Sequence, residues 1–348
     1  MKKVLALVMA AALALSMVAC GGSASKSTST AASTAASSAA ASVAASTAKG
    51  GKVGVCIYKF DDNFMTVYRN ALEKMLKDKG YEVTTVDGNN DQAKQTEQIN
   101  NFIAQGVSAL IINPVQSTAG ASIIELVKAA NVPTVIINRQ PSDDDMATWN
   151  KTVYVGADAS QSGTYQGQLI LNTANKGDIN GDGKVSYIMI QGDPENIDAK
   201  LRTEYSVKAL TDAGVTVEQL DMQRGDWDQA KGQEICATDL AKFGDKVEVV
   251  FCNNDAMALG ALEAIKAAGR TVGKDIYLVG VDALDDALAK VKAGEMTGTV
   301  LNDANGQATK AVEEMEALLG GATFEKGKQA VMVDYVMVTA ENVDQFMK

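Results

Sequence analysis

The chain has 348 residues, of which 46% are hydrophobic, and its formal net charge is −11. This length exceeds one average domain, and the apolar content is sufficient for two hydrophobic cores. The negative charge argues against nucleic acid and anionic lipid headgroups as partners, because both require a basic surface. The sequence contains no histidine, which excludes Ser-His-Asp and Cys-His catalysis, histidine-ligated zinc and a histidine-based pH switch.

Residues 1–20 have the pattern of a lipoprotein export signal. Lys2 and Lys3 precede an apolar run that ends near Met17 and is too short to span a membrane. The small residues before Cys20 resemble a lipoprotein cleavage box, in which Met17 is a less usual residue. We therefore expect Cys20 to carry a lipid anchor; ordinary secretion, with Cys20 removed or free, is the alternative.

Residues 21–50 consist almost entirely of Gly, Ser, Ala, Thr and Lys. Such a composition cannot bury a core and predicts a flexible tether. We expect an exported protein that is held by its lipid on the outer face of the cell membrane, or is otherwise periplasmic.

From Lys52 onward, short β-branched runs alternate with longer amphipathic stretches, which is typical of a doubly wound α/β fold. The predicted strands are 52–58, 81–86, 108–113, 133–138, 152–156, 184–190, 215–220, 247–252, 276–281, 298–301 and 331–337. Apolar residues at three-and-four spacing predict helices at 63–79, 92–105, 118–130, 161–174, 199–213, 228–242, 256–268, 283–293 and 304–319. Because one sheet seldom holds so many strands, we expect two Rossmann-like lobes with a ligand cleft between them.

Two familiar nucleotide-binding signatures are missing from this pattern. No G-x-G-x-x-G follows the first predicted strand, and no G-x-x-x-x-G-K-[ST] occurs. The remaining cysteines, Cys56, Cys236 and Cys252, lack metal-binding spacing, and their odd number argues against a complete disulfide framework. We expect Cys56 and Cys252, which lie in apolar runs, to be buried.

Several predicted strands run directly into Asn, Asp or an aromatic residue, as in VIINRQPS (135–142) and VVFCNNDAM (249–257). The carboxyl ends of parallel strands form the ligand-binding edge of such a sheet, and Asp, Asn and Arg match the paired hydroxyls of a sugar. The candidates are Asp62, Asn138, Asp198, Arg202, Asn254, Asp282 and Asn302, for which a turn or helix N-cap is the alternative role. Phe64 and Trp227 lie in predicted loops and are candidates for stacking on a sugar ring, with ordinary packing as the alternative.

Segments spread over nearly the whole chain after residue 51 closely resemble the periplasmic galactose/glucose-binding protein family. They are YKFDDNFM (58–65), NVPTVIINRQPS (131–142), YVGADASQSG (154–163), EVVFCNNDAMALGALEAIKA (248–267), VGVDALDDAL (279–288) and GTVLNDANGQA (298–308). The resemblance implies a monomer of the type I periplasmic binding protein fold, an aldohexose ligand, and sugar contacts from the candidates above. Its three hinge crossings would join one lobe of 51–157 plus 303–332 to another of 158–302 plus 333–348. Asn196 stands where the family has a sugar-contacting histidine, which leaves the ranking of galactose, glucose and other pyranoses open.

The segment that begins at Asp178 follows the first half of an EF-hand loop but has no Glu at its twelfth position. On the residues alone, an ordinary turn is the alternative. The resemblance implies a structural Ca²⁺ site that a distant glutamate completes, with ligands from Asp178, Asn180, Asp182, the Lys184 carbonyl, Ser186 and Glu248. Ser186 stands where the family has a glutamine ligand, so we expect a lower Ca²⁺ affinity than in the family.

We expect a binding protein that closes two lobes around galactose or glucose and delivers it to an ABC permease. The alternatives are a binding protein for another monosaccharide and a sugar sensor that docks on a chemoreceptor or sensor kinase. A glycan-processing enzyme would use Asp62, Asp198 and Asp282 as acid and base. A sugar-responsive repressor would need a basic helix-turn-helix where this chain has its export signal and tether.

Overall fold

The computed structural model describes residues 50–347. The predicted export signal, the predicted anchor Cys20 and all but the last residue of the predicted tether lie outside the described residues. The two main sheets belong to one compact unit, Thr47–Lys348. Within residues 50–347, no helix is long and apolar enough to cross a membrane.

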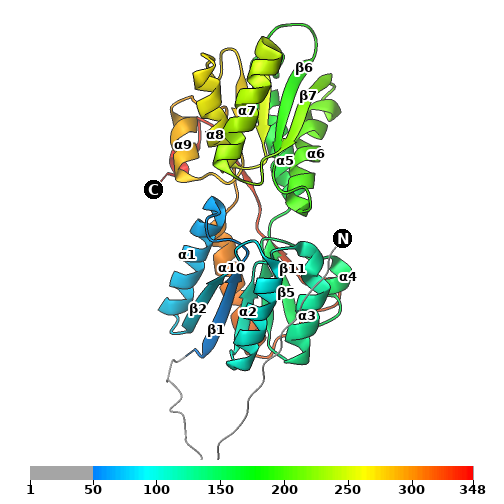
Figure 1. Ribbon diagram of the computed structural model, residues 1–348, viewed down its shortest axis with the longest axis vertical. Helices are drawn as coiled ribbons and strands as arrows, with labels where there is room; N and C mark the ends of the chain where they lie inside the picture. Colours follow the sequence, from blue (N-terminus) through cyan, green and yellow to red (C-terminus); the bar gives the residue numbers. More distant parts are fainter. Residues whose placement is uncertain (1–49, 348) are drawn as a thin grey trace, which may run out of the picture. The chain divides into compact units, whose positions relative to one another are not determined.

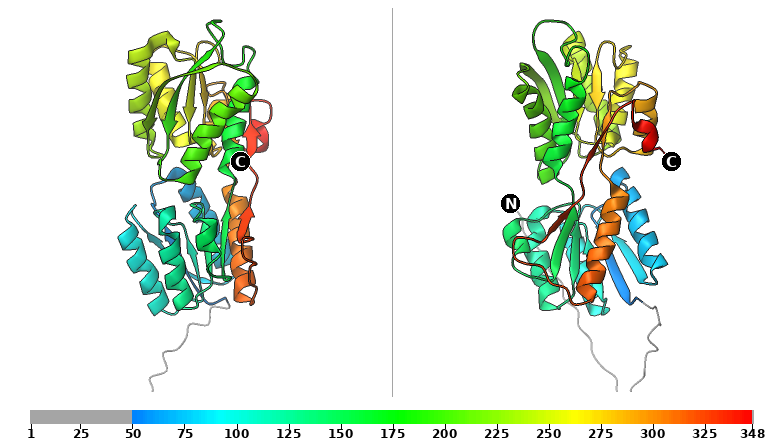
Figure 2. Two further views of the ribbon diagram at one scale, coloured as in Figure 1. Left: turned by 90° about the vertical axis from the view of Figure 1, so that its right-hand side faces the viewer. Right: turned by 180° about the vertical axis from the view of Figure 1, so that it is seen from behind.

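The first sheet consists of parallel strands in the order β11-β5-β4-β3-β1-β2 (Figure 1). Its strands are β1 (Lys52–Ile57), β2 (Glu82–Asp87), β3 (Ala109–Ile112), β4 (Thr134–Ile137), β5 (Thr152–Gly156) and β11 (Ala330–Met332). Its helices are α1 (Asn63–Asp78), α2 (Gln92–Ala104), α3 (Gly120–Ala129), the short α4 (Asp143–Met146) and α10 (Ala304–Leu319). Val55 and Ile57 pack toward α1 and α10, whereas Cys56 between them packs toward α2 and α3 on the other face. Figure 2 shows from two further sides how these helices cover the sheet.

The second sheet is parallel in the order β7-β6-β8-β9. Its strands are β6 (Val185–Gln191), β7 (Val217–Arg224), β8 (Val249–Cys252) and β9 (Tyr277–Val279). Helices α5 (Ala159–Leu171) and α6 (Ile197–Asp212) cover one face, and α7 (Gln229–Phe243), α8 (Asp255–Ala267) and α9 (Asp285–Lys292) cover the other. Phe251 points into the α5 side, and Cys252 into the α8 side, so this sheet also has a core on each face.

The chain crosses between the two sheets after β5, after β10 (Thr299–Leu301) and between β11 and β12 (Val336–Val338). Strands β10 and β12 pair antiparallel, and single bridges place β10 beside the end of β9. This topology confirms the predicted α/β fold with parallel-dominated sheets in two lobes. It also directs the carboxyl ends of both sets of strands toward the crossing segments.

The prediction of one strand over 331–337 is wrong. The segment forms β11 and β12, which belong to different sheets, because the chain crosses between them. In that crossing the Tyr335 amide donates to the side-chain oxygen of Gln161 at 2.7 Å, and its hydroxyl accepts from Arg202. The burial of Cys56 and Cys252 is confirmed; Cys236 is buried as well, and all three thiols are free.

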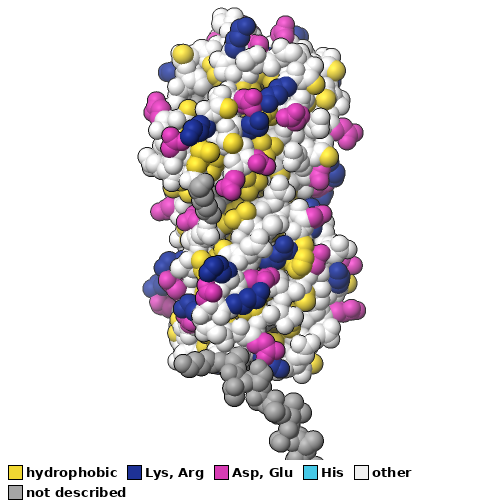
Figure 3. Space-filling view, turned by 90° about the vertical axis from the view of Figure 1, so that its left-hand side faces the viewer, with side chains coloured by type: hydrophobic (Ala, Val, Ile, Leu, Met, Phe, Trp, Pro, Cys, Tyr) yellow, Lys and Arg dark blue, Asp and Glu magenta, His cyan; other side chains and the backbone are white. Residues whose placement is uncertain are grey.

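On the face drawn in Figure 3, acidic and basic side chains are interspersed and form no continuous basic stripe. Ion pairs such as Lys266–Glu295 (3.1 Å) and Lys292–Asp344 (2.7 Å) join neighbouring elements. This face therefore lacks the electrostatic pattern that nucleic acid binding requires.

Candidate ligand-binding site

A polar pocket lies at the carboxyl ends of strands from both sheets and encloses about 350 Å³, its opening included. The lining residues are Tyr58, Asp62, Phe64, Met65, Asn138, Arg139, Asn196, Asp198, Arg202, Trp227, Asn254, Asp282 and Asn302. Every residue that was predicted from the sequence to contact a sugar is among them.

Sequence reasoning missed Tyr58, Met65 and Arg139 as lining residues. The Arg139 guanidinium lies 3.8 Å from the centroid of the Tyr58 ring and donates to the Val115 carbonyl oxygen. Its buried Nε has no hydrogen-bond partner among the described residues. Tyr58 directly follows β1 and Arg139 closely follows β4, so the strand-end pattern that marked Asn138 marks them too.

Three lining residues are also helix N-caps. The Oδ1 atoms of Asp62, Asn196 and Asn254 accept from backbone amides in the first turns of α1, α6 and α8, at 2.7, 3.0 and 3.0 Å. Helix capping was the alternative to ligand contact for residues of this kind. Here the same residues cap helices and also line the pocket. Oδ1 of Asn196 already accepts from the Asp198 amide, whereas its Nδ2 hydrogens have no acceptor among residues 50–347 and are free to donate to a ligand.

The pocket carboxylates differ in the hydrogen bonds that they accept from the protein. Asp62 accepts from the Tyr58 hydroxyl at 2.6 Å in addition to its cap. Asp282 accepts from the Asn302 side chain at 3.3 Å. Asp198 accepts no hydrogen bond from a described residue, and its nearest cation, Arg202, is 3.8 Å away. Asp198 therefore has both oxygens available to hydroxyl groups.

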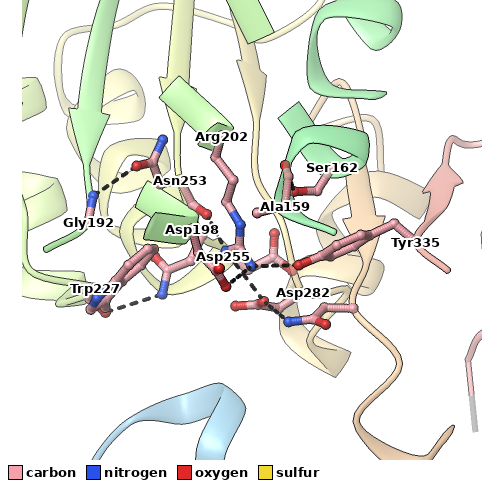
Figure 4. Close-up of polar contacts among 12 residues, drawn as sticks. Ala159, Ser162, Gly192, Asp198, Arg202, Trp227, Asn253, Asp255, Asp282 and Tyr335 are labelled. Carbon is pink, nitrogen blue, oxygen red and sulfur yellow. Dashed lines mark hydrogen bonds and ion pairs between the residues drawn. The ribbon is translucent and has the colours of Figure 1, made fainter. Parts of the chain in front are cut away.

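Arg202 lines the pocket and is 3% exposed. It donates to the Asn253 carbonyl oxygen at 2.8 Å and to the Tyr335 hydroxyl at 3.0 Å, as Figure 4 shows for Tyr335. Its distance to Asp282 is 3.9 Å, and its Nε has no partner among residues 50–347. The guanidinium thus joins the pocket to the crossing segment that carries Tyr335.

Burial is the largest single influence on the pKa values of Asp198, Asp282, Tyr335 and Arg202 in the pocket. It raises the pKa of Asp198 above its ordinary value and that of Asp282 further, although Arg202 opposes both shifts. Burial also raises the pKa of Tyr335 to about 12. For Arg202, burial alone would lower the pKa, but Tyr335, Asp282 and Asp198 outweigh it and raise the pKa. A ligand that donates hydrogen bonds to the two carboxylates would offset their desolvation.

Besides Tyr58, two further aromatic residues line the pocket, Phe64 from the first lobe and Trp227 from the second. Phe64 belongs to the first turn of α1, so the prediction that it lies in a loop is wrong; it packs edge-on against Tyr68, with the ring centroids 6.0 Å apart. Trp227 has a left-handed backbone (φ 66°), and its ring lies against Gly192, where an added Cβ would be 2.3 Å from ring carbons. Only a glycine at position 192 leaves room for the Trp227 ring so close to the backbone, and this contact helps to fix the position of the indole.

The predicted calcium ligands lie around the loop that precedes β6. Glu248 is 1% exposed and accepts from the backbone amides of Ile179 (2.7 Å), Asn180 (3.0 Å) and Ser186 (2.8 Å). Asp178 accepts from the amides of Gly181 and Gly183. Asn180 and Asp182 accept from backbone amides two residues later, the second of which belongs to Lys184.

The structure brings Glu248 to the loop as the resemblance implied, and the oxygen donors are of the kind that Ca²⁺ takes. Within the described part of the chain, however, no three Asp, Glu, Cys or His side chains are close enough to hold a metal ion. The Ser186 hydroxyl donates to Glu218 at 3.4 Å, outside the loop. Calcium binding therefore stays a prediction.

A family model for the periplasmic binding protein domain matches residues 53–323. The D-galactose/methyl-galactoside binding periplasmic protein MglB of Haemophilus influenzae is 36% identical over 86% of this chain and 93% of its own length. A putative rhizopine-binding protein of Rhizobium meliloti is 34% identical over 84% of this chain and 92% of its own length.

Among solved structures, an ABC transporter solute binding protein from Bacillus halodurans with bound myo-inositol has a TM-score of 0.74. It is 29% identical, and the match covers 85% of this chain and 97% of that protein. These matches confirm the family resemblance seen in the sequence and the prediction of a binding protein and not an enzyme. The chain belongs to the periplasmic binding protein family.

Proposed function

We propose that the chain is the sugar-binding protein of an ABC transporter, and that it captures an aldohexose, galactose or glucose, in the pocket described above. The observation that carries the proposal is the hydrogen-bonding state of the pocket. Asp198 and Asp282 have unfilled acceptor positions, while the Nε atoms of Arg139 and Arg202 and the Trp227 indole N–H have no acceptor among residues 50–347. The residues that carry these unpartnered donors and acceptors line one small cavity, which fits a ligand whose groups both donate and accept.

Sugar hydroxyls have this property, because each donates one hydrogen bond and accepts two. The rings of Phe64 and Trp227 complement the apolar C–H faces of a pyranose. The match of the other contact residues to the galactose/glucose-binding family, and the 36% identity to a D-galactose/methyl-galactoside binding protein, favour an aldohexose.

A cyclitol is the second candidate ligand. It offers the same ring of hydroxyls, and the protein from Bacillus halodurans carries bound myo-inositol. Asn196, which replaces the family histidine, is the lining residue at which this chain differs from the galactose/glucose-binding pattern. Another monosaccharide, such as ribose, is a further alternative, because its hydroxyls donate and accept in the same way.

Binding would stabilise a state in which both lobes contact the ligand, because the lining residues come from both sheets. The loaded protein would then deliver the sugar to its permease, or dock on a chemoreceptor or sensor kinase. From the pattern of residues 1–20, we propose export and lipid attachment at Cys20. Cys20→Ser should abolish labelling by a radioactive fatty acid in cells.

Titration calorimetry with D-galactose, D-glucose, D-ribose and myo-inositol tests the ligand proposal. We expect tight binding of an aldohexose by the wild type and a large loss of affinity in Trp227→Ala. The matched control is Trp149→Phe, which changes the chain's other tryptophan, a residue of the first lobe outside the pocket. Absence of binding to either hexose would overturn the aldohexose proposal, and hydrolysis of nitrophenyl glycosides would favour an enzyme.

We also propose that the loop around Asp178 binds Ca²⁺ in a structural role. Support comes from the alternating oxygen side chains of the loop and from Glu248, a buried carboxylate held beside it. Asp178, Asn180, Asp182, the Lys184 carbonyl and Glu248 would hold the ion. Ca²⁺ should raise the melting temperature above its value in chelator, and Glu248→Gln should reduce this difference; an unchanged wild-type melting temperature would contradict the proposal.

A further inference from the structure

Asp255 is a fully buried carboxylate that lies behind the pocket and does not line it. It is the first residue of α8 and directly follows the N-cap Asn254. Figure 4 shows its side chain close to those of Arg202 and Asp282. Its burial therefore needs an explanation other than ligand contact.

The Asp255 side chain joins two segments that are distant in sequence. Its Oδ2 atom accepts from the Leu284 backbone amide at 2.9 Å, and its Oδ1 atom accepts from the Thr299 hydroxyl at 2.6 Å. Its own backbone amide donates to the Val281 carbonyl oxygen at 2.7 Å. Asp255 thus holds both ends of the turn that contains Asp282, and fastens this turn to β10.

The turn is strained, which is why it needs such support. Asp282 has φ 123° and Ala283 has φ 53°, values that residues with a Cβ seldom adopt. Backbone in such regions persists only where the surrounding structure fixes it. Gly280 allows the close approach, because a Cβ there would lie 2.2 Å from Oδ1 of Asp255.

We propose that Asp255 is a positioning residue for ligand binding, which aims the Asp282 carboxylate into the pocket by holding its strained turn. This inference rests on the proposed sugar-binding function. Asp282 reaches Asn302 at 3.3 Å and Arg202 at 3.9 Å, so release of the turn would displace a carboxylate that lines the pocket. Asp255 acts without touching the ligand.

Substitutions at Asp255 show whether its hydrogen bonds or its negative charge support ligand binding. Asp255→Ala leaves the Leu284 amide and the Thr299 hydroxyl without their partner, and should weaken D-galactose binding by about tenfold or more. Asp255→Asn can accept from the amide and donate to the hydroxyl oxygen, so it should retain affinity within about threefold of the wild type. Thr299→Val, which removes one of the two contacts, should fall between them.

A double-mutant cycle distinguishes positioning from a general stabilising role. In an Asp282→Asn background, Asp255→Ala should change galactose affinity by less than about twofold, because its effect passes through Asp282. Urea unfolding of each variant measures stability separately. The matched control is Asp239→Ala, a buried carboxylate on α7 outside the pocket, which should leave affinity unchanged.

Wild-type affinity in Asp255→Ala, or additive effects of the Asp255 and Asp282 substitutions, would overturn the positioning role. If Asp255→Ala fails to fold, Thr299→Val in the two backgrounds gives the same comparison. Failure of the proposed function has a different signature, since neither the wild type nor the Asp239→Ala control would then bind any sugar of the panel.

Discussion

The side-chain amide of Asn254 joins the first turn of α8 to the backbone of Trp227. Its Oδ1 atom accepts from the Met257 amide at 3.0 Å, and its Nδ2 atom donates to the Trp227 carbonyl oxygen at 3.3 Å. Asp226 and Trp227 both have positive φ angles, 52° and 66°, so this turn needs an external support. One helix cap thereby sets the position of an aromatic ring in the pocket.

Asn254→Asp separates the two roles of this amide. Aspartate caps a helix as well as asparagine does, so the free energy of unfolding should change by less than about 1 kcal/mol. The donor to Trp227 is lost, and a carboxylate faces its carbonyl oxygen, so D-galactose affinity should fall about tenfold. Calorimetry and urea unfolding measure the two effects. Asp91→Asn, at the N-cap of α2, is the control; wild-type affinity in Asn254→Asp would contradict the role of the amide.

Asn196 should act as a hydrogen-bond donor to the ligand, because its Nδ2 hydrogens have no acceptor among the described residues while its oxygen already caps α6. Asn196→Ser retains a capping oxygen without the amide donor, and should bind D-galactose less tightly than the wild type. Asn196→Asp also caps, but it places an acceptor beside Asp198 and should bind less tightly still. Affinities from calorimetry decide the matter: tighter binding by Asn196→Asp than by Asn196→Ser would mean that this position accepts a hydrogen bond.

The pocket residues could be predicted because parallel strands of both sheets end at the ligand-binding edge, whatever the details of packing. The strand-end pattern cannot rank neighbours, however, and Arg139 was overlooked beside Asn138 although both line the pocket. Asp255 was not singled out for a different reason. Its partners, Leu284 and Thr299, are 29 and 44 residues away, and only the tertiary structure brings them together.

Residues 331–337 show what the periodicity of apolar residues cannot predict. Apolar residues recur through this segment as in one strand, yet Val333 donates to the Gly156 carbonyl oxygen of the first lobe while Val336 begins a strand in the other. A crossing between lobes does not interrupt the local pattern, because both halves are extended. Its position depends on contacts such as Arg202–Tyr335, which the local sequence does not encode.

Glu248 should be important for stability even without a metal ion. It accepts hydrogen bonds from backbone amides of Ile179, Asn180 and Ser186, and Glu248→Ala would leave these donors without their acceptor. We expect a loss of about 2–4 kcal/mol in the free energy of unfolding, measured with urea in the presence of chelator. The control is Glu218→Ala, which removes the exposed ion-pair partner of Lys184 and should cost less than about 1 kcal/mol. Equal losses in the two variants would contradict this role.

Asp239 and Asp221 form a carboxylate pair on the α7 side of the second sheet. The Gln223 amide bridges them, with distances of 3.2 Å to Asp239 and 3.1 Å to Asp221. Burial, followed by the hydrogen bond with Asp221 and its charge, raises the pKa of Asp239 to about 6. The folded protein therefore binds a proton at Asp239 more tightly than the unfolded chain, in which the pKa is about 3.9.

The sign of the resulting pH dependence follows from this difference. The stability that the Asp239 proton contributes is fully present below the unfolded pKa and is lost as the pH rises through about 6. Asp239→Asn mimics the neutral acid and can donate to Asp221, so its free energy of unfolding should exceed that of the wild type at pH 7.5 and approach it at pH 4. Urea unfolding at several pH values measures the difference in the free energy of unfolding between the wild type and Asp239→Asn. Both proteins contain the other titrating groups, Asp255 included, so the contributions of these groups cancel in the difference. A difference that does not change with pH would show that Asp239 does not carry this proton.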